Sequence, residues 1–579
     1  MVSSFTAGSA LVFVVVVVLF VSLVPFQSEI GDRDECDVKE NHTEPIGRGG
    51  GFVVQPIFRI TVTQGIFRPY PRELGDPLEQ SRKFIRVCRS SCRHAQRRNF
   101  SSSTKLDATG LPNCAHSPTP YKGASYERVM KSRECMVTTA QKPFYKKPLL
   151  LHEGRGQWLW DHEGKRYLDM FAGIATVSVG HCHPKVVEAA TQQSRQLGHT
   201  TAVYLHPRYH EYAEKLTSKL PAPLSCVYLT NSGSEATELA IQLARIYTGR
   251  HEVVSLRNCY HGGTGVAASA TCMSVYKYPI MPLPGHVHVA NPDVYRGPWG
   301  GRNCRDSPCQ ANRDCACTGN KCEAEDRYLE QFDELYRTQL PSDGKIAAFT
   351  AESIQGVGGT VQFPRNYLRR VYEAVRSRGG LCIADEVQTG FARTGTHFWG
   401  FEAHGVRPDI VVMAKGIGNG YPLGAVVTTP EVSQALARAS YFNTYAGNPV
   451  ACAVGNAVVQ VIEEESLQEN AHTVGTQLLH DLASLMREFP ETIGDVRGKG
   501  LMIGVELVAD PETREFLPAD DVAFIFEDIK DSGVLIGRGG VKGNVFRFKP
   551  PLCVTKEDAT CSVDVFRAAL KKFRAQRKR

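Results

Sequence analysis

The stretch Leu381-Cys-Ile-Ala-Asp-Glu-Val-Gln388 decides the fold class, because a short apolar run leads directly into two carboxylates. Similar apolar runs occur at 226–229, 252–256, 346–351 and 410–413. Segments with the apolar spacing of helices lie between them, at 236–247 and 367–375. Short strands that are buried on both faces and alternate with helices predict an α/β fold. We expect a mostly parallel sheet with helices on each side.

The residues that follow these strands predict the chemistry, because ligands of parallel sheets bind at the carboxyl ends of the strands. Asn231-Ser-Gly-Ser-Glu-Ala236 follows one strand and opens a helix, where free amides and the positive end of the helix dipole suit a phosphate. Ordinary helix capping is the alternative interpretation. Tyr260 follows another strand, within Asn258-Cys-Tyr-His-Gly-Gly263, and either stacks on a flat ligand or packs half-buried against the core.

Asp385 and Lys415 are charged residues at the ends of apolar strands. A buried carboxylate needs a cationic partner, and a protonated ring nitrogen would supply one to Asp385. Lys415 follows the run 410–413 between two small residues, a position that favours a neutral or covalently engaged amine. A phosphate site, a stacking aromatic, an acid for a ring nitrogen and a Schiff-base lysine together indicate pyridoxal 5′-phosphate. The freed Lys415 amine would then act as the general base.

Five motifs resemble those of class-III aminotransferases in order and spacing. They are Asn231-Ser-Gly-Ser-Glu-Ala236, Tyr260-His-Gly262, Ala384-Asp-Glu-Val-Gln-Thr-Gly390, Ala414-Lys-Gly-Ile-Gly418 and Asn443-Thr-Tyr-Ala-Gly-Asn-Pro449. The resemblance covers about residues 121–575 and implies a fold-type I enzyme with pyridoxal 5′-phosphate as its cofactor. It also implies a homo-oligomer, a dimer at least and otherwise a tetramer, with active sites at the subunit interface.

The resemblance implies the following division of the chain. A large domain spans 186–450 and contains a Cys-rich insertion at 296–325. A smaller α+β domain is built from both chain ends, 121–185 and 451–579, and residues 1–120 form an N-terminal extension.

The resemblance also implies the site residues. Lys415 and Asp385 are catalytic, and Arg547 binds the substrate carboxylate through its planar guanidinium. The cofactor-binding residues are Gly233, Ser234, Tyr260, Glu352, Asp385, Val387, Gln388, Lys415 and Thr444.

Within that set, the resemblance gives several residues distinct roles. Gly233 and Ser234 bind the phosphate through their amides, and Val387 packs on the ring that Tyr260 stacks against. Gln388 contacts the phenolic oxygen of the cofactor. Thr444 reaches the phosphate from the other subunit.

Val357 favours a small substrate. Several family members carry a glutamate at this place that pairs with the carboxylate-binding arginine, so Arg547 should stay free for a small carboxylate. Segments such as 171–184 and 295–301 resemble the members that move amino groups from alanine, and from small β-amino acids such as 3-aminoisobutyrate, to glyoxylate or pyruvate. The alternatives are a phospho-lyase on the same scaffold, another omega-aminotransferase, or a non-catalytic membrane-anchored relative.

The net charge of +7 does not indicate a nucleic-acid partner. Residues 80–105 carry +8 and the last nine residues carry +6, so the rest of the chain is net acidic at −7. We therefore expect amino acids and 2-oxo acids as ligands and no nucleic acid.

The N-terminal extension contains two conflicting targeting signals. Residues 80–105 are rich in Arg and Ser and contain no acid, which is typical of a mitochondrial presequence. Residues 10–26 are almost entirely apolar and close to the length of a membrane span. We expect the mitochondrial matrix, with a secretory or membrane-anchored protein as the alternative. Membrane contact would require that residues 10–26 are retained.

A cysteine cluster lies in the insertion, with the spacing C-x4-C-x5-C-x-C-x4-C at Cys304, Cys309, Cys315, Cys317 and Cys322. This is not a standard zinc pattern. We interpret it as a family loop without a metal, and a metal site is the alternative.

Overall fold

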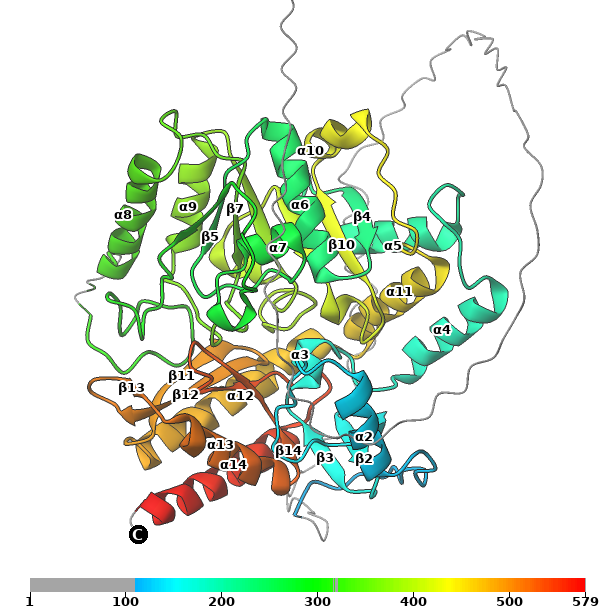
Figure 1. Cartoon of the computed structure of the whole chain (residues 1–579), viewed down its shortest axis with the longest axis vertical. Coiled ribbons are helices and arrows are strands. Elements are labelled where there is room, and N and C mark those ends of the chain that lie inside the picture. The colour runs from blue at the N-terminus through cyan, green and yellow to red at the C-terminus, as the bar shows by residue number, and fades with distance from the viewer. Residues whose placement is uncertain (1–109, 316, 318–320, 578–579) are drawn as a thin grey trace, which may run out of the picture. The chain divides into compact units, whose positions relative to one another are not determined.

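The computed structural model describes residues 110–315, 317 and 321–577. The apolar segment 10–26 and the presequence-like segment 80–105 lie outside the described residues. None of the described helices is both long enough and apolar enough to cross a bilayer. The elements are shown in Figure 1.

A seven-stranded sheet forms the centre of the α/β fold, in the order β4-β10-β9-β8-β7-β5-β6. Its strands are β4 (Cys226–Thr230), β5 (Val253–Leu256), β6 (His286–Val289), β7 (Ala348–Glu352), β8 (Leu381–Asp385), β9 (Ile410–Met413) and β10 (Gly424–Thr428). Only β10 runs antiparallel to its neighbours. The mostly parallel sheet and the five strands predicted from sequence are confirmed, whereas β6 and β10 were not predicted.

Alternate residues of each strand contact different helices. On one face Ala348, Ile383 and Val412 pack against α6 (Gly233–Thr248). On the other face Phe349 and Cys382 pack against α8 (Glu323–Thr338) and α9 (Tyr367–Arg376). Helices therefore cover both faces, as the continuous apolar runs predicted.

Two smaller sheets accompany the large one. The four-stranded sheet contains β1 (Leu151–Arg155), β2 (Trp158–Asp161), β3 (Arg166–Asp169) and β14 (Val534–Leu535). The five-stranded sheet contains β11 (Ile493–Lys499), β12 (Met502–Asp510), β13 (Glu515–Phe516), β15 (Gly537–Gly539) and β16 (Val545–Phe548). Because β14 pairs with β3, the cyan N-terminal strands and the red C-terminal elements lie side by side in Figure 1.

The remaining helices connect and cover these sheets. They are α2 (Tyr126–Met136), α3 (Ala172–Ala175), α4 (Pro184–Gln196), α5 (Pro207–Thr217), α7 (Gly265–Ala270), α10 (Pro430–Ala435), α11 (Pro449–Glu464), α12 (Leu467–Glu488), α13 (Ala519–Asp531) and α14 (Lys556–Arg577). Short 3-10 turns occur at η1 (Ser274–Tyr276), η2 (Gly400–His404), η3 (Lys415–Ile417) and η4 (Leu436–Arg438).

The described part of the N-terminal extension, residues 110–120, packs against the four-stranded sheet. Leu111 is buried in the core, and the guanidinium of Arg166 donates to the carbonyl of Pro112 at 2.7 Å. The backbone N–H of Thr119 donates to Glu153 at 2.8 Å. The division of the chain at 120, 185 and 450 stays a prediction.

A buried ion pair joins the Cys-rich insertion to the five-stranded sheet. Arg305 and Asp495 are fully buried, and the guanidinium donates to both carboxylate oxygens at 2.7 and 2.9 Å. Arg497 donates to the same carboxylate at 3.0 Å and contacts Glu506 at 2.7 Å. Burial opposes ionisation of Asp495, but the two arginines outweigh it and lower its pKa. The ion pair therefore fixes the insertion, because removal of one partner would leave the other charge buried and unpaired, which strongly lowers stability.

We predict that Arg305→Met lowers the free energy of unfolding by about 3 to 5 kcal/mol, because it leaves the Asp495 carboxylate buried without its bidentate partner. Urea denaturation followed by tryptophan fluorescence measures the change. Arg302→Met is the matched control, since Arg302 is exposed in the same loop. Equal stability of the two variants would contradict the structural role of the pair.

Candidate active site

A cavity of about 300 Å³ opens at the carboxyl ends of the central strands. Eight of the predicted site residues line it: Gly233, Ser234, Tyr260, Glu352, Asp385, Val387, Gln388 and Lys415. They come from segments that are up to about 180 residues apart in the chain, and the parallel sheet brings them to one edge. Thr444 and Arg547 are not among the lining residues.

Asp385 is the last residue of β8 and is buried. One carboxylate oxygen accepts from the backbone N–H of Val387 at 3.1 Å, and the other lies 2.7 Å from Nδ1 of His261. The Nε2 of His261 has no hydrogen-bond partner among the described residues. His261 therefore holds the carboxylate in place. This contact was not predicted, although His261 stands directly after Tyr260 in the quoted motif.

The other two acids at this edge have different partners. Glu386 accepts hydrogen bonds from Thr389 and from the backbone of Gly400 and Phe401, so it holds the following loop. Glu352 accepts from the backbone of Tyr260 and of Gly356. Burial, and then the adjacent charge of Asp385, raise the pKa of Glu352. Glu352 therefore secures the loops around the cavity, which both Glu352 and Asp385 line.

Lys415 directly follows β9 and Ala414, and its side chain enters the cavity. Its φ is +54°, in the left-handed region that non-glycine residues rarely adopt. Burial of the amine lowers its pKa, although Asp385 and Glu352 oppose the shift. The amine is thus more available as a nucleophile and base near neutral pH than an ordinary lysine.

The start of α6 forms a cup that suits a phosphate. Ser232 caps the helix by accepting from the backbone N–H of Glu235, and Ser234 accepts from the backbone N–H of Gly263 at 3.1 Å. Gly262 has φ +136°, and a Cβ there would lie 2.6 Å from the Ser234 hydroxyl. The space is therefore kept open by glycine, beside free helix amides.

Tyr260 and Val387 line the same cavity as Asp385. Tyr260 packs edge to face against Tyr276, with ring centroids 4.9 Å apart. This contact fixes the orientation of the Tyr260 ring. A flat ring placed in the cavity would meet an aromatic, an aliphatic side chain and a carboxylate.

Gln388 contacts a buried lysine that was not predicted as a site residue. The Nζ of Lys549 donates to Oε1 of Gln388 at 3.0 Å. Burial, and then the neighbouring Arg547, lower the pKa of Lys549 well below its usual value. Lys549 fixes the Gln388 amide. It lies two residues after Arg547 and directly follows the end of β16.

Arg547 lies on β16, next to the cavity, and is buried. Its Nε donates to the carbonyl of Arg538 at 3.0 Å, and its guanidinium stacks over the ring of Phe171 at 5.3 Å. Its Nη1 has no hydrogen-bond partner among the described residues. Burial lowers its pKa to about 10, so it remains charged at neutral pH.

Thr444 lies on an exposed loop of the single chain, between η4 and α11. Its hydroxyl is not part of the cavity of its own chain. The predicted role of Thr444 in a second subunit therefore stays a prediction.

The arrangement fits pyridoxal 5′-phosphate. The glycine-lined cup, the Tyr260 and Val387 side chains, the buried Asp385 and the Lys415 amine with its lowered pKa meet the four requirements of that cofactor in one cavity.

The comparisons with known proteins agree with this site. The family model described as "Aminotransferase class-III" matches residues 140–570. The chain is 50% identical over 464 residues to the mitochondrial alanine–glyoxylate aminotransferase 2 of Homo sapiens. The matched region covers 79% of this chain and 89% of the human protein.

Solved structures show the same similarity. A phospholyase from Arthrobacter in complex with phosphoethanolamine matches with a TM-score of 0.68 and 32% identity, over 76% of this chain and 99% of that one. An omega-transaminase from Pseudomonas jessenii in complex with PMP matches with a TM-score of 0.68 and 28% identity, over 79% and 97%. By its sequence and its fold-type I structure, the chain belongs to the class-III aminotransferases.

Proposed function

We propose that this enzyme transfers the amino group of L-alanine, and of small β-amino acids, to glyoxylate or pyruvate. The observation that carries the proposal is the buried Arg547, which makes no ion pair with an acid among the described residues and keeps an unpartnered N–H. The similarity to the human alanine–glyoxylate aminotransferase 2 supports the choice of substrates.

Pyridoxal 5′-phosphate, the cofactor of class-III aminotransferases, supplies an electron-withdrawing ring to the substrate when it is bound. The residues around it have separate tasks. Asp385, held by His261, would keep a ring nitrogen protonated, and the cup at Gly233 and Ser234 would bind the phosphate. The Lys415 amine, whose pKa is lowered by burial, would take the proton from the substrate carbon and act as the proton donor later in the transfer.

Arg547 selects for a small carboxylate. Val357 lines the cavity at the place where an acidic side chain could pair with the guanidinium, and its own side chain is apolar. The carbonyl of Val357 accepts from the backbone N–H of Gly540. A Cβ on Gly539 would lie 2.8 Å from Nε of Arg547, so the strand leaves little room beside the guanidinium. Alanine would leave as pyruvate, and glyoxylate would leave as glycine.

The proposal includes a homodimer and a mitochondrial location. Thr444 is exposed on its own chain, which suits a residue that completes the phosphate site of a second copy. The similar human protein is named as mitochondrial, which agrees with the composition of residues 80–105.

A phospho-lyase is the second candidate, because the Arthrobacter phospholyase is similar over almost its whole length. The two reactions differ in their products. A phospho-lyase acting on phosphoethanolamine releases phosphate without an oxo-acid acceptor. We expect no phosphate release from this enzyme, and release at the rate of its amino transfer would favour the lyase.

We predict that Lys415→Ala lowers kcat for the alanine–glyoxylate reaction by about 10³-fold or more, because the general base and the nucleophile are both lost. Added methylamine should restore part of the rate by replacing the missing amine. Steady-state glycine formation measures both effects. Lys345→Ala, at an exposed lysine, is the control. Full activity of Lys415→Ala would exclude the proposed role.

We predict that Arg547→Gln lowers kcat/KM for alanine by about 10²-fold, because a neutral amide cannot pair with the substrate carboxylate. The loss should appear mainly in KM. The affinity for the cofactor, measured by equilibrium dialysis, should stay unchanged, since Arg547 does not line the cofactor cavity. A matching loss of cofactor affinity would show that Arg547 supports the fold and not the substrate.

A further inference from the structure

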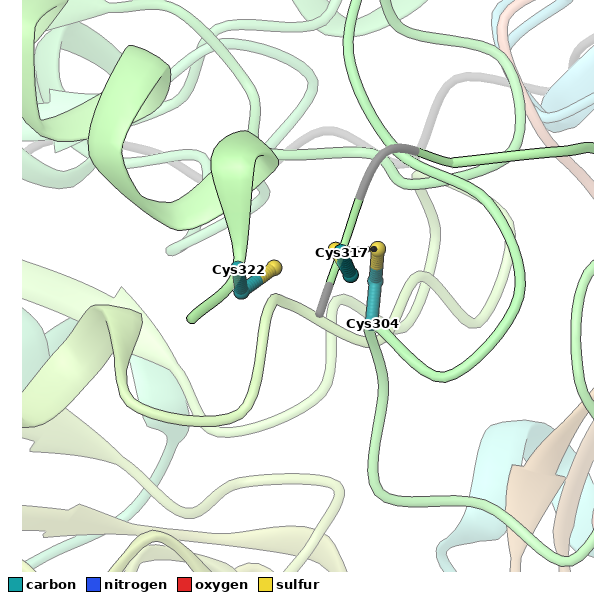
Figure 2. A group of neighbouring side chains, drawn as sticks. All are labelled: Cys304, Cys317 and Cys322. Atoms are coloured by element: carbon teal, nitrogen blue, oxygen red, sulfur yellow. Dashed lines mark hydrogen bonds between the residues drawn. The ribbon is translucent and has the colours of Figure 1, made fainter. Parts of the chain in front are cut away.

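Four cysteine thiols meet beside the start of α8, outside the active-site cavity. Sγ of Cys304 lies 3.3 Å from Sγ of Cys315 and 3.4 Å from Sγ of Cys317, and the last two lie 2.9 Å apart. The Sγ atoms of Cys304, Cys317 and Cys322 all lie within 4.8 Å of one another. Figure 2 shows these three side chains together at the helix start.

The four thiols are not joined as disulfides and are not dispersed as ordinary core residues. All are free, Cys304 is fully buried, and the other three pack partly buried against the same core. A thiol is a weak donor and a weak acceptor, so neutral thiols gain little from gathering at such short separations. One cation bound by all four sulfur atoms would account for their convergence.

The distances suit one tetrahedral ion. With metal–sulfur bonds of about 2.3 Å, tetrahedral thiolates lie about 3.8 Å from one another. The observed separations, from 2.9 Å to within 4.8 Å, bracket this value. They leave no space for the inorganic sulfides of an iron–sulfur cluster. Four thiolates in a tetrahedral set are the preferred ligands of zinc.

The place of the four thiols in the chain suits a structural role. Cys322 is the N-cap of α8, where the positive end of the helix dipole stabilises a thiolate. The cysteines lie in the long connection between β6, which ends at Val289, and α8, in which the described residues form no helix or named strand. Connections of this length without secondary structure need another means of holding their shape.

We propose that Cys304, Cys315, Cys317 and Cys322 bind one structural zinc ion that fixes the Cys-rich insertion. Cys304 is adjacent to Arg305, whose buried pair with Asp495 anchors the insertion to the five-stranded sheet. The ion fastens the other end of this segment to α8. The sequence favoured a family loop without a metal, because the spacing of the five cysteines is not a standard zinc pattern.

Cys309 lies in the same Cys-rich insertion and provides a matched control. Its thiol faces the carbonyl of Leu479 at 3.7 Å and packs against the other core, and it makes no thiol contact among the described residues. Cys309→Ser therefore removes a cysteine of the insertion without removing a proposed ligand.

The experiment measures zinc in the cofactor-loaded enzyme, purified without metal-affinity resin, by inductively coupled plasma mass spectrometry. We expect about one zinc ion per chain in the unmodified protein and in Cys309→Ser. Cys317→Ser and Cys322→Ser should retain about one-tenth or less, and their thermal midpoints should fall. KM for alanine should stay unchanged, because none of these thiols lines the active-site cavity.

A second measurement does not depend on folded variants. Titration of the unmodified enzyme with an organomercurial should release zinc to a chromogenic chelator as the four thiols react. Protein without zinc whose thiols are all free, or are joined in a disulfide by mass spectrometry, would overturn the proposal. Full zinc content in both Cys317→Ser and Cys322→Ser would equally overturn it.

Discussion

The structure depends on two opposite charges that are held at the ends of neighbouring buried strands. Asp385 ends β8, and Lys415 follows β9 beside it. A buried charge at the edge of the sheet is unfavourable without a partner. Asp385 and Lys415 are accommodated by different means. His261 orients the carboxylate, and the burial of the amine shifts its proton equilibrium toward the neutral form. The cavity is therefore prepared for a cofactor that carries a ring nitrogen and an aldehyde.

Much of the fold could be predicted from sequence because the strands are buried on both faces. The runs 381–384 and 410–413 are continuous and apolar, and they became β8 and β9. β10 was missed because Gly424-Ala-Val-Val-Thr428 follows a Gly- and Pro-containing turn and runs against its neighbours. β6 was missed because its two histidines, His286 and His288, interrupt the apolar pattern.

The site could be predicted where a residue stands at a strand end, and not where contact depends on distant segments. Asp385 and Lys415 belong to the first kind. His261 and Lys549 belong to the second, because only the folded chain brings them to Asp385 and Gln388. The convergence of Cys304 with Cys322 is of the same kind, since the residues between them follow no regular spacing. The net charge of the chain gave no information on the ligand, because the proposed substrate-binding group is one buried residue, Arg547.

A single-turnover experiment tests the central claim most directly. Purified enzyme with bound cofactor is mixed with L-alanine without any acceptor, and the pyruvate formed is counted per active site. Amino transfer predicts one equivalent of pyruvate, and later addition of glyoxylate should yield one equivalent of glycine. Absence of pyruvate, or continued pyruvate formation beyond one equivalent before glyoxylate is added, would contradict the proposed transaminase.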